Sequence, residues 1–526
     1  MLHEEKKRYF KIEAGGTAPN KAAWSAENVK KRKAKQQLAV QEQKRLEKTK
    51  NLIKRSSVLA HPQVGGRLLR EFGVVDPELP VASWAAGLRE KGGICFLPGQ
   101  EWMEDARNIS CMLIDGEDEA SGLGAVYATP DGQHVVGSYI PTDKDDKINF
   151  AETDQMRASR LANLREEDIH MHEITSMTHH KRSGIILLTS MDPDGASGST
   201  DAEITFFRPR LSMLSAPNPA TAGFYRREFG GRKPAWLLGS GPGQMYFSMS
   251  VRGLAINAAR MCPASGAFNI VLATNHGVMR MGPMDSLSDV KWVTTPPASA
   301  GAPSRRGGEK NRKGRARARA EAEAEAEAAS PRDVYGVDFQ PSSEHVIYAG
   351  CRDSKIHRID MRVPYWEADW DWYRHHSAVA HVRSLDHNQI LAAGPKSSMA
   401  IYDVRWGKKG KEAMPVVRFP EYRNAAHLQI GLDVTHDVGG VGGLGCGGVV
   451  AAAMDDGTVG IFSLRSGRKL KAGDVDNPEK LKAANGVVKT LQFEKMPWEK
   501  ETSLFVGVGP VVKKFSFGVD DDDEEW

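Results

Sequence analysis

Two stretches in the last third of the chain decide the fold: VYGVDFQPSSEHVIYAGCRDSKIHRIDMR at 334–362 and AHVRSLDHNQILAAGPKSSMAIYDVR at 380–405. They share one order: a strand, a polar turn, an apolar strand ending in Ala-Gly, a second polar turn, and a strand ending in Ile-Asp-Met-Arg or Tyr-Asp-Val-Arg. Asp360 and Asp403 lie 43 residues apart (403 − 360). A four-stranded propeller blade repeats every ~40–45 residues. The pair therefore predicts two successive blades.

Weaker copies of the same pattern lie on both sides of this pair. Short β-type runs, each bounded by Gly, Asp, Asn or Pro, replace helical periodicity from about residue 90 onward. Five further candidate blades cover 124–140, 184–209, 268–282, 427–467 and 486–517. Closing such repeats into a ring leaves only short, protected sheet edges. We therefore expect an all-β fold, a WD-repeat β-propeller of seven blades.

Composition changes along the chain indicate how it is organised. Residues 1–60 read as a basic helical extension, with one helix expected over 21–55 because neither Pro nor Gly interrupts that stretch. The propeller is expected over 90–518. A low-complexity insert at 295–332 has almost no bulky apolar residue, so it cannot offset its ordering entropy and is predicted to be disordered. Residues 519–526 form an acidic tail.

Charge and cysteine content exclude several classes of protein. The net charge is only +4 over 526 residues, so the bulk balance does not indicate a nucleic-acid binder. No apolar run approaches the ~18 residues of a membrane span, and the first residues have no apolar signal core, so neither a membrane nor a secretory segment is expected. The cysteines are odd in number and form no CxxC pair, which favours a reduced intracellular compartment. They are Cys95, Cys111, Cys262, Cys351 and Cys446.

Three stretches resemble chemical motifs but lack the required context. The GVGGLG at 440–445 matches GxGxxG but is followed by strands rather than a helix. The GSGPG at 239–243 lacks the strand–turn–helix frame of a nucleophile elbow. In HMHEITSMTHH at 170–180, Ser176 stands where HExxH needs its second His. We expect that stretch to be a polar strand and loop on the outer face of a blade, with a weak metal site at His170 and His172 as the alternative.

Taken together, these observations predict no catalytic residue, no metal and no cofactor, and hence a protein that is not an enzyme. The aspartates of the polar turns are expected to be structural, hydrogen-bonding the turn and pinning the blade. They are Asp353, Asp455 and Asp456.

A basic run lies within the predicted N-terminal helix. The KKRKAK at 30–35 is compatible with a nuclear import signal, a phosphate contact or a solvated helix face. Its basic residues are Lys30, Lys31, Arg32, Lys33 and Lys35. A second basic stretch at 305–319 favours nuclear residence over a purely cytoplasmic location. Nucleic-acid binding stays open, because such runs alone supply only non-specific, salt-sensitive affinity.

The two blade endings resemble the WDxR ending of WD repeats in receptors of cullin-4 ubiquitin ligases. Ile359 and Tyr402 stand where that family prefers Trp. The resemblance implies that the two arginines contact the ligase adaptor, damage-specific DNA-binding protein 1, with support from the aspartates. The implied adaptor-binding residues are Asp360, Arg362, Asp403 and Arg405.

The N-terminus adds to this resemblance. EEKKRYFKIEAG at 4–15, followed by a basic helix, is similar to the opening of the cullin-4-associated factor 4 family, with the match on Lys7, Arg8, Tyr9 and Phe10. The expected Leu-Pro-Gly and Tyr pair upstream are missing. The resemblance implies a non-catalytic receptor that binds the adaptor and presents a substrate protein. The alternative is a nuclear scaffold that binds RNA, pre-ribosomal or chromatin partners through the basic helix.

Overall fold

A computed structural model describes most of the chain in two units, Met1–Val74 and Val75–Trp526, which are treated separately. The described residues are 2–3, 8–9, 26–51, 78–96, 108–116, 124–140, 164–180, 184–192, 201–209, 244–263, 269–282, 290–296, 330–341, 343–365, 370–406, 414–438, 448–481, 486–496 and 499–518.

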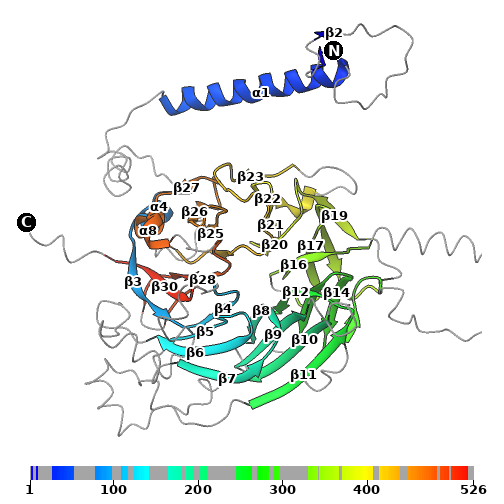
Figure 1. The fold of residues 1–526 in the computed structure, drawn as a ribbon, viewed down its shortest axis with the longest axis vertical. Helices are drawn as coiled ribbons and strands as arrows, with labels where there is room; N and C mark the ends of the chain where they lie inside the picture. Colours follow the sequence, from blue (N-terminus) through cyan, green and yellow to red (C-terminus); the bar gives the residue numbers. More distant parts are fainter. Residues whose placement is uncertain are drawn as a thin grey trace, which may run out of the picture. The chain divides into compact units, whose positions relative to one another are not determined.

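In the larger unit, the described residues form seven four-stranded antiparallel sheets arranged as a ring (Figure 1). The strands of each blade are given from the inner to the outer one. Blade 1 consists of β4 (Met112–Asp115), β5 (Gly124–Ala128), β6 (His134–Ile140) and β7 (Leu164–His170), and blade 2 of β8 (Glu173–His180), β9 (Ile185–Asp192), β10 (Asp201–Arg208) and β11 (Gln244–Arg252). Blade 3 consists of β12 (Ile256–Met261), β13 (Ile270–Thr274), β14 (Gly277–Met281) and β15 (Val290–Trp292), and blade 4 of β16 (Val334–Phe339), β17 (Val346–Cys351), β18 (Lys355–Asp360) and β19 (Asp371–Arg374). Blades 5 to 7 are β20 (His381–Ser384), β21 (Gln389–Gly394), β22 (Ser398–Asp403), β23 (Val417–Arg418); β24 (Leu432–Thr435), β25 (Val449–Ala453), β26 (Val459–Ser463), β27 (Lys469–Leu470); and β28 (Leu491–Glu494), β29 (Ser503–Val508), β30 (Val511–Phe517), β3 (Leu88–Cys95).

The seven-bladed propeller predicted from the repeats is confirmed. Each of the seven candidate stretches contributes strands to a different sheet. Blades 4 and 5 contain the two stretches that decide the fold, and the strands that end in Asp-Met-Arg and Asp-Val-Arg are the third strands of those blades, β18 and β22.

The hydrophobic core lies between blades. Seven clusters of buried apolar residues occur in the described chain, and each joins one blade to its neighbour. Between blades 3 and 4, for example, Val271 and Val278 pack with Val337 and Ile347. Both faces of every sheet are therefore covered, which explains why a strand such as β25 (VVAAA) is buried at every position and does not alternate.

The ring is closed by a segment far upstream of the blade that it completes. β3 (Leu88–Cys95) pairs antiparallel with β30 as the outer strand of blade 7, with Leu88 opposite Phe517 and Cys95 opposite Val511. In Figure 1 the blue β3 lies beside the red β30. The register shifts between Glu90 and Gly93, and Gly92 in this bulge has a φ of 92°, a conformation that favours glycine.

A short helix just before the closing strand packs against blades 6 and 7. α4 (Leu79–Ala86) begins with Pro80 near its first turn, ends before Gly87, and packs on the outer part of blade 6. Its Trp84 is 2% exposed and lies against Phe493 of blade 7, with the rings tilted by 53° and their centroids 6.1 Å apart. Two short helical segments, η8 (Gly473–Asp476) and α8 (Pro478–Leu481), complete this region.

Polar contacts between inner strands add a second connection around the ring. Each inner strand, or the residue just before it, bonds the backbone of the inner strand in the next blade. The seven contacts are Ala259 N–H to Ser176 Oγ (3.1 Å), Asn257 Nδ2–H to Val334 O (2.7 Å), Ser384 N–H to Asp338 Oδ2 (2.8 Å), Arg383 Nη2–H to Leu432 O (3.5 Å), Phe493 N–H to Asp433 Oδ2 (2.8 Å), Ile114 N–H to Gln492 Oε1 (2.8 Å) and Cys111 Sγ–H to Ile174 O (3.6 Å).

The smaller unit contains the predicted N-terminal helix. α1 spans Ala26–Asn51, inside the expected 21–55. A two-stranded sheet, β1 (Leu2–His3) with β2 (Arg8–Tyr9), precedes it. No helix among the described residues is long and apolar enough to cross a membrane.

Several predictions from sequence fall on residues outside the described ranges. These are Lys7 and Phe10 of the N-terminal match, residues 297–329 of the insert, the acidic tail at 519–526, the GVGGLG at 440–445, the GSGPG at 239–243, and Cys446.

The closing segment yields a stability prediction. Replacing Trp84→Ala removes a large buried side chain from the contact between α4 and blades 6 and 7, and should lower the free energy of unfolding by about 3–5 kcal/mol. Urea unfolding followed by tryptophan fluorescence and circular dichroism would measure it.

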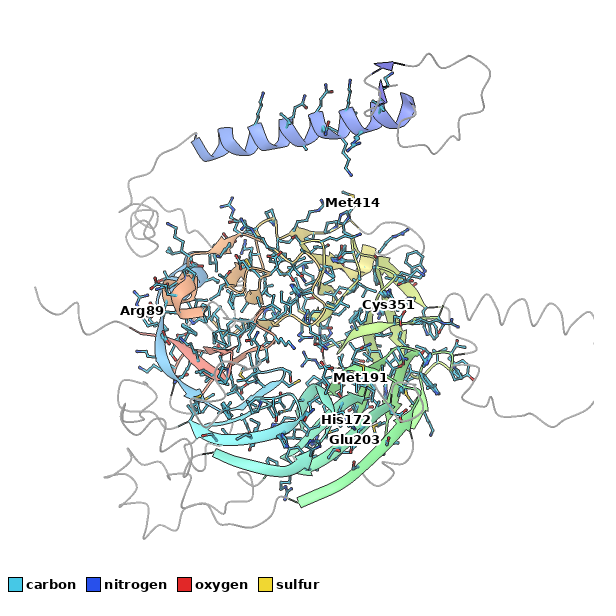
Figure 2. All side chains as sticks on the ribbon, viewed as in Figure 1. Arg89, His172, Met191, Glu203, Cys351 and Met414 are labelled. Atoms are coloured by element: carbon cyan, nitrogen blue, oxygen red, sulfur yellow. The ribbon has the colours of Figure 1, made fainter. Side chains whose placement is uncertain are left out.

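Met414→Ala is the matched control, because Met414 is 87% exposed. Figure 2 labels it at the outer margin of the ring. It should change stability by less than about 0.5 kcal/mol. Equal midpoints for the two variants would show that α4 does not contribute to closure.

Candidate functional site

The two Asp-x-Arg turns have the same geometry in consecutive blades. In blade 4, Asp360 Oδ1 accepts hydrogen bonds from the backbone N–H of Arg362 (3.0 Å) and from its Nε (2.9 Å), while Asp360 Oδ2 accepts one from Nη2 (2.6 Å). In blade 5, the corresponding distances from Arg405 to Asp403 are 2.9, 3.0 and 2.6 Å. This two-point grip fixes the guanidinium plane in one orientation in both turns.

Both arginines lie at the surface. The side chains of Arg362 and Arg405 are 65% and 62% exposed, although their aspartates are more enclosed. The guanidinium of Arg362 lowers the pKa of Asp360, and Asp360 in turn raises the pKa of Arg362. Asp403 likewise raises the pKa of Arg405. Two permanently charged, oriented donors are therefore presented to solvent.

The two turns open on one face of the propeller. Because every sheet is antiparallel, the first and third strands of a blade run in the same direction and end on the same face. The backbone shows this directly. The N–H of Met361 donates to His345 O (2.8 Å) and that of Val404 to Asn388 O (2.8 Å), so each Asp-x-Arg turn touches the first turn of its own blade. We call this side, with Arg362 and Arg405, the Asp-x-Arg face.

The residue before each aspartate belongs to the core. Ile359 and Tyr402 are both buried. The hydroxyl of Tyr402 shares a hydrogen bond with His375 Nδ1 (2.8 Å), and His375 Nε2 shares another with Ser398 Oγ (2.8 Å). Burial lowers the pKa of His375 to about 4, so the neutral ring links the two hydroxyls. Tyr402 therefore anchors β22 beneath the Arg405 turn.

Blade 4 also holds the Arg405 turn directly. The hydroxyl of Tyr373, in β19, donates to the carbonyl of Val404 (2.9 Å). Val404 begins η7 (Val404–Trp406), the short helical turn that contains Arg405. The sequence did not predict Tyr373, His375 or Ser398 as supports of this turn. None of them lies in an Asp-x-Arg ending; Ser398 begins the same strand as Tyr402, whereas Tyr373 and His375 reach it from blade 4 only in the folded ring.

The turn aspartates have the structural role predicted for them. Asp353 Oδ1 accepts the N–H of Lys355 (3.2 Å), and Asp456 Oδ1 accepts that of Thr458 (3.0 Å). Asp455 Oδ2 accepts the N–H of Ala425 (3.2 Å) and so ties its turn to the preceding loop.

The histidine-rich stretch spans a blade boundary. His170 ends the outer strand β7 and is exposed, whereas His180 lies in the inner strand β8 and is buried. The expectation of an outer-face strand and loop is therefore wrong for the second half of the stretch, because blade 2 begins at Glu173. In the part of the chain that the structure describes, no group of three or more His, Cys, Asp or Glu side chains could hold a metal ion.

In α1, four residues of the basic run, considered for nuclear import or a phosphate contact, are exposed: Lys30, Arg32, Lys33 and Lys35. The side chain of Lys31 lies outside the described set. The described side chains of this helix include three exposed apolar ones, Val29, Leu38 and Val40.

Comparisons with known proteins identify no family. No family model matches the chain, and no curated protein matches it. Among solved structures, the crystal structure of the computationally designed Ika8 protein is similar, with 10% identity, a TM-score of 0.39, and coverage of 81% of this chain and 99% of the other.

Buried histidines predict a loss of stability in acid. Burial lowers the pKa of His357 and of His375 to about 4, against ~6.5 in an unfolded chain. The unfolded chain therefore takes up protons first as the pH falls. The free energy of unfolding is highest above pH ~6.5 and declines toward pH 4. Each of the two histidines lowers it by about 2 kcal/mol between pH 7.5 and 5.

Urea midpoints at several pH values would test this in wild type and His375→Gln. The variant is weaker at every pH, since it loses hydrogen bonds, but its stability should depend less steeply on pH. An unchanged slope would mean that His375 is not held neutral.

Proposed function

We propose that this chain is a non-catalytic substrate receptor of a cullin-4 ubiquitin ligase. In this proposal, Arg362 and Arg405 bind the adaptor, damage-specific DNA-binding protein 1, with Asp360 and Asp403 orienting them. A β-propeller is typically an interaction scaffold, although the fold hosts many functions and does not decide between them.

One observation supports the proposal best: the same two-point Asp–Arg grip occurs twice, in consecutive blades and on one face. Neither guanidinium bridges to another blade among the described residues, so stability of the ring does not explain the repetition. Arg in an oriented, exposed position is a frequent hot spot of protein interfaces. A receptor of this kind works by position, because tethering a substrate raises its effective concentration near the ubiquitin-charged enzyme.

The test is binding to purified damage-specific DNA-binding protein 1, by co-purification and by titration. Wild type should bind, and the Arg362→Ala/Arg405→Ala double variant should bind at least about tenfold more weakly while keeping its fold.

Arg352→Ala is the matched control. Arg352 is 70% exposed and lies 3.8 Å from Asp333, but it sits in the turn between β17 and β18, on the opposite face. It should bind like wild type. Failure of wild type to bind, or equal loss in all variants, would refute the receptor proposal.

The exposed basic side chains of α1 support a second candidate, a nuclear scaffold that binds RNA, pre-ribosomal or chromatin partners through this helix. Replacing Lys30, Arg32, Lys33 and Lys35 with Gln should then weaken binding of a nucleic-acid duplex. It should also reduce the slope of log affinity against log salt by about 0.9 per lost phosphate contact. Filter binding between 50 and 300 mM salt would measure this, and an unchanged slope would exclude α1 as the contact.

A further inference from the structure

Exposed apolar side chains gather at the two Asp-x-Arg turns. Single exposed apolar residues are normal in soluble proteins and need no explanation. In the described part of the propeller, five large apolar side chains are exposed: Val363, Met414, Val416, Leu428 and Phe517. The first three belong to the loops that follow the third strands of blades 4 and 5, the same loops that carry Arg362 and Arg405.

Val363 is part of the turn in blade 4. It directly follows Arg362, and its N–H donates to the carbonyl of Asp360 (3.2 Å), so the backbone of the turn holds it. Its side chain is nevertheless 39% exposed. The turn therefore presents an apolar side chain next to its guanidinium.

Met414 and Val416 lie on the approach to the turn in blade 5. β22 and β23 pair antiparallel with Ile401 opposite Val417, and the N–H of Val416 donates to Ile401 O (2.8 Å). Residues that precede β23 therefore lie toward the end of β22, where the Arg405 turn begins. The side chains of Met414 and Val416 are 87% and 57% exposed, so this edge of blade 5 is apolar and open to solvent.

The other two exposed apolar side chains have different surroundings. The ring of Phe517 lies over Gly87, at the junction of α4 and β3. Leu428 lies in the loop between β23 and β24, where an inner strand begins, and hence on the face opposite the Asp-x-Arg turns. The group at the two turns is therefore specific to blades 4 and 5 of one face.

The two guanidiniums keep hydrogen-bond donors for a partner. The bonds from Arg362 to Asp360, and from Arg405 to Asp403, use Nε and Nη2. In the described part of the chain no bond is recorded for Nη1 of either arginine, and this nitrogen carries two N–H groups. A carboxylate or carbonyl oxygen of a partner can therefore bind to each arginine without breaking its Asp–Arg grip.

We propose that Val363, Met414 and Val416 form one docking surface with Arg362 and Arg405, and that the ligase adaptor covers it with apolar side chains flanked by oxygen acceptors. This inference rests on the proposed function and adds an apolar part to that interface. Protein interfaces are enriched in Arg and Met. A nucleic acid fits the surface less well, because Val and Met offer neither an aromatic face to a base nor a charge to a phosphate.

The experiment is calorimetric titration of the full chain with damage-specific DNA-binding protein 1, at 50 and 300 mM salt. The Val363→Ser/Met414→Ser double variant should bind at least about tenfold more weakly than wild type. Because the lost contact is apolar, this factor should be equal at both salt concentrations, whereas the loss in Arg362→Ala/Arg405→Ala should shrink at 300 mM. The heat-capacity change of binding should also be less negative in the serine variant than in wild type.

Two variants serve as controls. Leu428→Ser is matched to Val363→Ser, because Leu428 is 36% exposed but lies on the opposite face, and its affinity should stay within about twofold of wild type. Met414→Leu keeps the apolar area and should also bind like wild type. Circular dichroism would show that each variant is folded.

The outcomes separate this inference from the receptor proposal. Wild-type affinity in Val363→Ser/Met414→Ser would overturn the inference and leave the receptor proposal standing. No binding by wild type would overturn both. Self-association of wild type that is lost in the same variant, measured by sedimentation velocity, would assign the surface to a second copy of this chain and would also overturn the inference.

Discussion

Ring closure is the constraint on which the rest of the structure depends. Each blade buries apolar side chains only against its neighbours, so blades 1 and 7 would expose a core face if the ring opened. The chain closes the ring with a segment that precedes blade 1 in the sequence. β3, from residues before blade 1, becomes the outer strand of blade 7, and α4 packs on blade 6. Local contacts build each sheet, but closure of the ring depends on the pairing of β3 with β30, in which Leu88 lies opposite Phe517, 429 residues away in sequence (517 − 88).

Hydrophobic contact alone does not fix how neighbouring blades align, because apolar packing has little directional preference. The hydrogen bonds between inner strands supply that direction. Asp338 and Asp433 each accept one specific backbone N–H in the next blade, so a slip of one residue would leave a half-buried carboxylate without that bond. These contacts explain why polar and charged residues occur in strands that are otherwise apolar.

The repeat pattern allowed the blades to be predicted because it is local: strand, turn and strand follow one another, and the third strands of blades 4 and 5 end in matching Asp-x-Arg. The closing strand could not be predicted in the same way. β3 reads LREKGGIC, with two glycines and no alternation, and its partner lies at the other end of the chain. The residues that support the Arg405 turn could not be predicted from the sequence for the same reason. Tyr373 and His375 reach Val404 and Tyr402 only after two blades pack together.

Antiparallel blades also place two kinds of arginine on one side of the molecule. Arg362 and Arg405 follow third strands, and Arg383 stands near the end of a first strand, which runs in the same direction. The difference lies in their counter-charges. The outer arginines are each gripped by an aspartate two residues away, while Arg383 has none within ion-pair distance in the described chain. The first arrangement presents a fixed donor to solvent, and the second directs the guanidinium to main-chain carbonyls of its own blade and of the next one.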